Sequence, residues 1–162
     1  MENRNSYYSI ACSDFNYLKD VMSTGYCNQL AEQAQRVAEK MLKSVAEVTC
    51  VDIEKLLKSH NIRGIYDMIH RVEPDFVLDR NGLSTLKDYY YDTQYPGENF
   101  IIVTEEELLE AYEIMLSVVG AVERWREAHG LPVELASARE EFRLALKQQE
   151  EKMKSPDVMN VF

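Results

Sequence analysis

The sequence predicts an all-α fold, an antiparallel up-and-down bundle of four to five helices followed by an extra charged C-terminal helix. Apolar residues recur at three- and four-residue steps in most segments, and turn residues separate these segments. Residues 100–103 are the one strand-like run, and a single strand has nothing to pair with. The longest uncharged apolar stretch, residues 115–122, is far shorter than the roughly 20 residues of a membrane span, so no membrane association is expected.

Three apolar stripes predict helices in the first half of the chain. They cover residues 8–22, before a stop at Gly25, then residues 30–45, and then residues 62–69, before Pro74. Asp52 is placed to cap a short helix that runs through Leu56 and Leu57.

Turn residues and a capping box organise the second half. Asn81-Gly82 predicts a turn, and the spacing of Leu83, Leu86 and Tyr90 predicts a short helix that ends at the turn of residues 95–97. Thr104 with Glu107 forms a capping-box pattern, which predicts a helix from there to about Ala128.

Two regions follow from this pattern: residues 1–129 as the bundle, and residues 130–162 as a charged helix and tail. Gly130 and Pro132 separate them. The second region is expected to be helical from Val133 to near Met153, with Leu135, Phe142 and Leu146 as its apolar anchors. Residues 155–162 are expected to be a loose end or a docking peptide.

The charge balance limits the classes of partner. The 162 residues carry a net charge of −10, which excludes a uniformly basic nucleic-acid-binding coat. Residues 36–63 are locally basic, so any polyanion contact is expected there. The three cysteines lack metal-ligand spacing, and with only three histidines we expect no metal site, no cofactor and a cytoplasmic protein with reduced thiols.

Arg63 and His70 are candidate catalytic residues. They lie seven residues apart, nearly two helical turns, so both share a face with Asp67. Arginine can hold a phosphate and histidine can move a proton near neutral pH, a combination suited to phosphodiester cleavage. The alternative is a plain surface ion pair between Arg63 and Asp67, with His70 uninvolved.

Arg36, Lys40 and Lys43 form a second candidate, for binding phosphate. Their spacing aligns them on one face, opposite the apolar stripe of their helix. The alternative is a solvated outer face, which the flanking Glu32 and Glu39 favour.

Aromatic residues and a histidine near helix ends are further candidates. The tyrosines of residues 89–91 and Tyr95 can stack on bases or fill the core. His60, at a helix entrance, can be a cap, a core residue or a ligand contact.

Three segments in order resemble the HEPN (higher eukaryotes and prokaryotes nucleotide-binding) family. Residues 35–43 resemble its "Ala-Glu-Lys, then Leu-Lys" helix, and residues 59–62 its Thr/Ser-His-Asp/Asn-Leu segment. Residues 86–90 and 95–97 resemble its tyrosine stretch ending in Arg-Tyr-Pro. The resemblance extends over roughly residues 6 to 128.

The resemblance implies a bundle of four or five helices, often dimeric. It also implies either a metal-independent ribonuclease or a protein that accompanies a small nucleotidyltransferase in toxin–antitoxin-type or defence systems. Arg63 and His70 match the family's spacing of Arg, four to six residues and His. Gly64 and Gln94 depart from the pattern, because active members place a polar residue and many relatives an arginine at these positions.

We therefore expect a protein that binds nucleotide or RNA, or a nucleotidyltransferase partner, and forms a homodimer. The expected binding residues are Arg36, Lys40, Lys43, His60 and Tyr95. The first alternative is a dimeric endoribonuclease that uses Arg63 and His70. The second is a non-catalytic interaction module.

Overall fold

The computed structural model describes residues 6–50 and 53–154 and is all-helical in these ranges, as the sequence predicts. The long helices are α1 (Tyr7–Val21), α2 (Cys27–Thr49), α7 (Glu105–Ala128) and α8 (Ala136–Lys154). Shorter helices connect them: α3 (Ile53–Lys58), α4 (Ile62–Val72), α5 (Arg80–Lys87) and α6 (Tyr89–Asp92). Asp52 and residues 155–162 lie outside the described residues, so the predicted cap and tail are not described.

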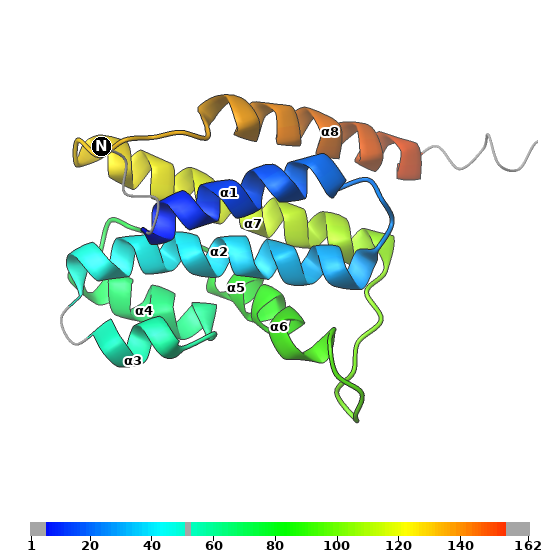
Figure 1. Ribbon diagram of the computed structural model, residues 1–162, viewed down its shortest axis with the longest axis horizontal. Helices are drawn as coiled ribbons and strands as arrows, with labels where there is room; N and C mark the ends of the chain where they lie inside the picture. Colours follow the sequence, from blue (N-terminus) through cyan, green and yellow to red (C-terminus); the bar gives the residue numbers. More distant parts are fainter. Residues whose placement is uncertain (1–5, 51–52, 155–162) are drawn as a thin grey trace, which may run out of the picture.

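Helix α2 is the centre of the bundle. It packs against α1 and α7 on one side and α4, α5 and α6 on the other (Figure 1). Its predicted stripe is buried throughout, and so are all six residues from Met41 to Ala46. Because a helix covered from several sides has little solvent face, its polar side chains must find partners inside the protein.

The predicted apolar stripes of α1, α4 and α7 are also buried. The residues concerned are Tyr8, Ala11, Phe15, Leu18 and Met22 of the α1 region, Ile62, Ile65, Tyr66 and Ile69 of α4, and Leu108, Ala111, Met115, Val118, Val122 and Trp125 of α7. Both hydrogen bonds of the Thr104–Glu107 capping box are present. Gly25 has a φ of 88°, which explains why a glycine stands in the turn between α1 and α2.

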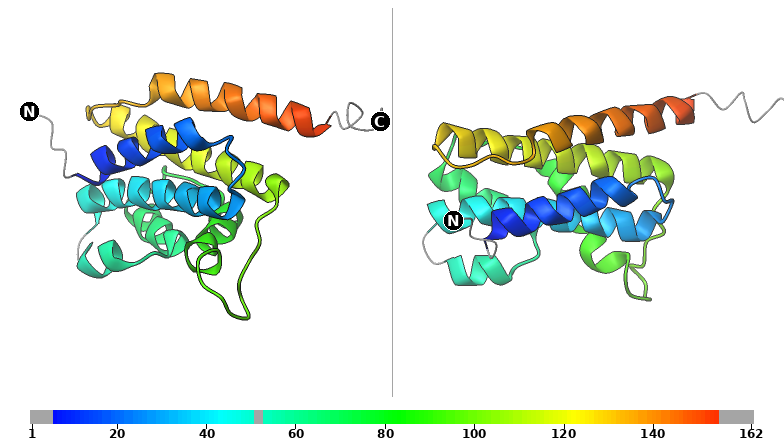
Figure 2. Two further views of the ribbon diagram at one scale, coloured as in Figure 1. Left: turned by 45° about the vertical axis from the view of Figure 1, so that its right-hand side comes forward. Right: turned by 45° about the horizontal axis from the view of Figure 1, so that its top comes forward.

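Helix α8 lies across α7 and α1, on the side away from α4 and α5 (Figure 2). Phe142 is fully buried, and its ring centroid lies 5.3 Å from that of Phe15 and 5.1 Å from that of Tyr112. Leu135 and Leu146 are buried as predicted. No helix in the described ranges has the length and apolar character that crossing a membrane requires.

Three local predictions are wrong. Asn81 and Gly82 lie in the first turn of α5, because the Asp79 side chain accepts a hydrogen bond from the Asn81 N–H (3.0 Å) and caps the helix. Tyr90 lies in α6, after the break at Asp88. Helix α8 begins at Ala136, not Val133.

The late start of α8 has a clear cause in the buried carboxylate of Glu123. Glu123 accepts hydrogen bonds from the Leu135 N–H (3.0 Å), the Tyr8 hydroxyl (2.6 Å) and Arg139 Nε (2.9 Å). The Tyr8 hydroxyl in turn accepts from the Glu134 N–H (2.7 Å). These contacts hold residues 134–135 extended, so the helix begins after them.

Residues 100–103 are extended but form no strand within the described chain. Asn28 binds this segment from α2: its Nδ2 donates to the Ile101 carbonyl (2.8 Å) and its Oδ1 accepts from the Val103 N–H (2.7 Å). A single side-chain amide thus replaces the partner strand.

We expect Glu123→Ala to lower the free energy of unfolding by about 3 kcal/mol, because the buried donors of Tyr8 and Leu135 lose their acceptor and the half-buried Arg139 loses its counter-charge. Urea denaturation measures the change. Glu127→Ala, an exposed position one turn further along α7, is the matched control and should change stability by less than about 0.5 kcal/mol. Equal losses for both variants would contradict this account of α8 docking.

Candidate functional site

The carboxylate of Glu39 is the buried centre of a polar cluster on α2. Glu39 is 5% exposed, and its Oε2 accepts from Lys43 Nζ at 3.0 Å. Its Oε1 accepts from Gln35 Nε2 at 3.1 Å and lies 3.0 Å from His60 Nδ1. A buried carboxylate is stable only with such partners, so this cluster links α2 to the segment between α3 and α4.

The spacing on α2 explains the cluster. Gln35, Glu39 and Lys43 follow one another at four-residue steps, which places them along one line of the helix. Gln35 Nε2 also lies 3.4 Å from the His60 carbonyl oxygen. Side chain and backbone of His60 are thereby both held by α2.

This geometry sets the tautomer of His60. An ionised carboxylate only accepts hydrogen bonds, so Nδ1 carries the proton that is donated to Glu39. In the neutral ring Nε2 is then an acceptor. The side chain of His60 is 35% exposed, so the ring reaches the surface while its position is fixed from inside.

Aromatic rings extend the cluster towards solvent. The ring of Tyr90 stacks on His60 with centroids 4.0 Å apart and an angle of 14°. Tyr91 meets Tyr90 edge-on at 4.6 Å and is 56% exposed, and the Arg36 guanidinium lies 5.8 Å from the Tyr90 centroid. Burial, followed by the charge of Glu39, raises the pKa of the Tyr90 hydroxyl.

A pocket of about 430 Å³ opens beside these rings, and we call it the His60 pocket. Its lining comes from the α3–α4 segment and from α5–α6: Lys58, Ser59, His60, Asn61, Lys87, Asp88, Tyr91 and Asp92. Within the described ranges neither of its two lysines forms an ion pair. Its volume lies in the range typical of small-molecule sites.

The predicted cationic face of α2 does not form as expected. Lys43 is 3% exposed and pairs with Glu39, because α2 is covered on this side. Lys40 pairs with Asp14 of α1 (2.5 Å), and Arg36 pairs with Glu32 (2.6 Å). The three side chains therefore do not form one solvent-facing track, although Arg36 lies over the Tyr90 ring that stacks on His60.

Tyr95, the remaining predicted binding residue, lies beyond the end of α6. It is exposed and is not among the residues that line the His60 pocket. Its predicted role in binding stays a prediction.

Arg63 and His70 are half-buried: Arg63 lies against α5, and His70 lies against the segment between α4 and α5. Arg63 Nη1 donates to Ser84 Oγ (3.0 Å), and His70 Nδ1 donates to the Phe76 carbonyl (2.9 Å). Because a carbonyl only accepts, Nε2 of neutral His70 is the ring atom left to take a proton.

The alternative prediction, an ion pair between Arg63 and Asp67, is wrong. Asp67 binds Arg80 instead, in a two-point contact of 2.9 and 3.0 Å. Arg80 begins α5, and the α4–α5 packing brings its guanidinium to Asp67. The face between Arg63 and His70 thus stays polar and carries a second arginine.

Sequence reasoning missed Glu39, Lys58, Lys87 and Arg80 as site residues. The signal for Glu39 is that Gln35 and Lys43 stand four residues before and after it, so one row of the helix carries three polar side chains. Lys58 lies in the basic window of residues 36–63, where a polyanion contact is expected, whereas Lys87 gave no signal because its approach to Lys58 depends on how the chain packs. No group of three or more His, Cys, Asp or Glu in the described part of the chain is arranged to hold a metal.

We expect Glu39→Gln to lower the free energy of unfolding by about 1–3 kcal/mol, because an amide offers one acceptor where Lys43, His60 and Gln35 supply three donors. Urea denaturation monitored by circular dichroism measures the loss. Glu32→Gln, on the same helix but in a partly exposed pair, should change stability by less than about 1 kcal/mol. A larger loss at Glu32 would show that the Glu39 cluster is not a stabilising centre.

Comparison with known protein families matches residues 5–125 to the HEPN domain. No curated protein and no solved structure matches the chain. The matched range spans α1 to α7 nearly in full and includes the Glu39 cluster, the His60 pocket and the Arg63–His70 face. A HEPN domain indicates a function related to nucleotides or RNA. On this match the chain belongs to the HEPN domain family.

Proposed function

We propose that the protein binds a nucleotide, free or at the end of an RNA, in the His60 pocket. The observation that carries the proposal is the convergence of Lys58 and Lys87 on a pocket whose wall, His60, is fixed by the buried Glu39. A prearranged wall reduces the ordering cost of binding. The HEPN match supports the same ligand class.

Each part of a nucleotide has a complementary group in this pocket. The two lysines attract phosphate, and Asn61 caps α4 there, so the positive end of that helix adds to their field. The exposed ring of Tyr91 offers a face for a base to stack on. Asp88 and Asp92 can accept hydrogen bonds from ribose hydroxyls or a base amino group.

The charges favour a short ligand over a long RNA. Two lysines and two aspartates balance around the pocket, and the whole chain carries −10. Long nucleic acids are bound by many phosphate contacts, which this surface does not offer. One nucleotide needs only the local lysines.

The biological setting of this proposal follows the family resemblance. The protein would act in the cytoplasm as the homodimeric accessory partner of a nucleotidyltransferase, in a toxin–antitoxin-type or defence system. Light scattering of the purified chain tests the dimer. Co-purification with a nucleotidyltransferase encoded beside it tests the partner.

We expect millimolar AMP or ATP to raise Tm by a few degrees in the native chain, because a ligand bound only by the folded state stabilises it. Lys58→Ala with Lys87→Ala should abolish this shift. The control pair Lys55→Ala with Lys147→Ala removes the same charge from exposed positions outside the pocket and should keep it. No shift in the native chain, or an equal loss in both pairs, would overturn the proposal for free nucleotides.

A metal-independent endoribonuclease is the second candidate function. The specific observation is the tautomer of His70, whose Nε2 is left to accept a proton on the face of α4 that carries Arg63, while Asp67 balances the charge of the neighbouring Arg80. In such a reaction Nε2 of His70 would take the proton of the ribose 2′-hydroxyl, and the 2′-oxygen would attack the phosphorus of the phosphate that Arg63 holds. A 2′,3′-cyclic phosphate would form as the bond to the 5′-oxygen breaks, and that oxygen would take a proton from water. Two copies facing one another would complete the site of a dimer.

We expect RNA cleavage in EDTA, if the chain is a nuclease, to fall at least about 100-fold in His70→Ala, the usual scale for losing a general acid or base. His129→Ala is the matched control, because its Nδ1 also donates to a backbone carbonyl, that of Trp125. Gel electrophoresis of a labelled RNA reports the rate. Absence of cleavage by the native chain, with no nucleotide-induced shift in Tm, would leave the non-catalytic interaction module as the better description.

A further inference from the structure

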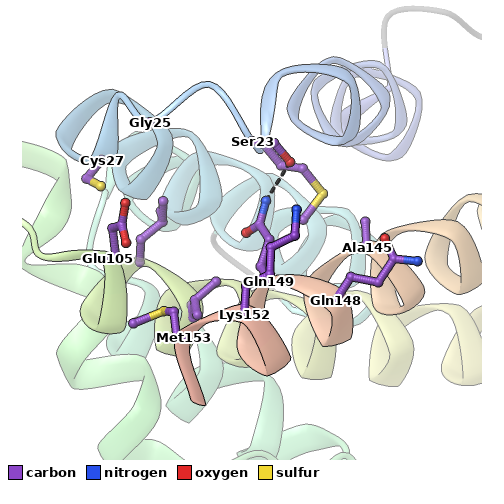
Figure 3. A pocket seen from close by; sticks show the side chains of 12 residues that line it. Ser23, Gly25, Cys27, Glu105, Ala145, Gln148, Gln149, Lys152 and Met153 are labelled. Atoms are coloured by element: carbon purple, nitrogen blue, oxygen red, sulfur yellow. Dashed lines mark hydrogen bonds between the residues drawn. The ribbon is translucent and has the colours of Figure 1, made fainter. Parts of the chain in front are cut away.

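A groove at the far end of α8 lies outside the site proposed above. Two cavities, of about 310 and 320 Å³, share Leu109 of α7 and Met153 of α8 in their lining, and we call them together the Met153 groove. In the first cavity Cys27 and Glu105 lie towards one end, near Met153, and the hydrogen bond between Gln149 and Ser23 lies further along it (Figure 3).

Part of the lining of the groove is apolar. The side chains concerned are Met22, Leu108, Leu109, Ala145 and Met153. Met22, Leu108 and Leu109 belong to the core, whereas Ala145 and Met153 are partly exposed on α8. An apolar side chain from outside could therefore be buried against Met153.

The rim of the groove is strongly acidic. Glu105, Glu106, Glu110, Glu113 and Glu150 line its cavities, against Lys152 and Lys154. None of these five carboxylates forms an ion pair within residues 6–50 and 53–154. The groove thus combines an apolar floor with a rim of net negative charge.

Two of the carboxyl groups, those of Glu113 and Glu150, interact with each other. Burial and then a hydrogen bond with Glu150 raise the pKa of Glu113, and the charge of Arg143 opposes this only in part. Two neighbouring carboxylates repel when both are ionised. A cation placed between them would stabilise both in the charged form.

We propose that the Met153 groove docks a basic amphipathic segment of a partner protein. An apolar side chain of that segment packs beside Met153 and Leu109, and lysines or arginines on either side of it pair with the glutamates of the rim. The net negative charge of the rim favours a basic segment over the other two candidates, the end of this chain and a second copy of it. Residues 155–162 of this chain contain one acidic residue and no lysine or arginine, and a second copy would add another net charge of −10.

The proposal is independent of nucleotide binding and has its own test. The probe is a fluorescent twelve-residue peptide with leucine and lysine at helical spacing, titrated against the full chain by anisotropy. Glu110→Gln, Glu113→Gln and Glu150→Gln together should raise Kd at least about tenfold. Glu54→Gln, Glu127→Gln and Glu140→Gln make the same change in charge at exposed sites elsewhere and should raise it less than about twofold.

Several results would overturn the proposal. One is an equal effect of both triple variants, since that would mean attraction to net charge alone. A second is equal binding of the peptide with glutamate in place of lysine. A third is a change in oligomeric mass in the first triple variant, which would assign the groove to a second copy. A fourth is hydrogen-exchange protection over residues 155–162 that the peptide removes, which would assign the groove to the chain's own end.

Met153→Ser tests the apolar half of the same proposal. It should weaken peptide binding several-fold while leaving the far-ultraviolet spectrum unchanged, because Met153 is only partly buried. Leu144→Ser, an exposed apolar residue of α8 outside both cavities, is the control. Equal weakening by the two variants would contradict docking at Met153.

Discussion

The burial of a charged carboxylate on the central helix is the constraint on which the site depends. Glu39 lies on α2 where neighbouring helices leave it almost no contact with water, so its charge must be balanced inside the protein. Lys43 supplies the balancing charge, and His60 and Gln35 supply the remaining donors. Because His60 lies between α3 and α4, satisfying one carboxylate also fixes the chain that walls the His60 pocket.

The same principle recurs at the other side of the bundle. Glu123 of α7 is buried, and its partners come from α1, from the segment before α8 and from α8 itself. Two helices held by apolar contacts alone can shift relative to each other at little cost. A buried carboxylate, in contrast, is satisfied only when its hydrogen-bond donors are held at the right positions. Each of the two glutamates therefore fixes a connection between parts of the chain: Glu39 the α3–α4 segment, and Glu123 the C-terminal helix that extends beyond the HEPN match.

Local patterns predicted the helices well and the site only in part. The capping box correctly predicted the start of α7. The apolar stripes of α1, α2 and α4 are buried, because apolar residues at helical spacing mark the face of a helix that packs on the core. Lys43 was predicted to face solvent but is buried, because the sequence of one helix does not reveal how many neighbouring helices will cover that helix. The pairing of Arg80 with Asp67 escaped prediction for a related reason: it arises only from the packing of α5 on α4.

Charge is distributed unevenly over this acidic chain, and the two proposed surfaces differ accordingly. The His60 pocket has its lysines matched by aspartates, so a phosphate there meets no excess of negative charge. The rim of the Met153 groove has five glutamates against two lysines and would repel the same phosphate. Electrostatic repulsion falls off over about 8–10 Å in physiological salt, so each surface acts on its own surroundings. The two proposals are therefore compatible with a net charge of −10, because one places an anion at the His60 pocket and the other a cation-bearing segment at the Met153 groove.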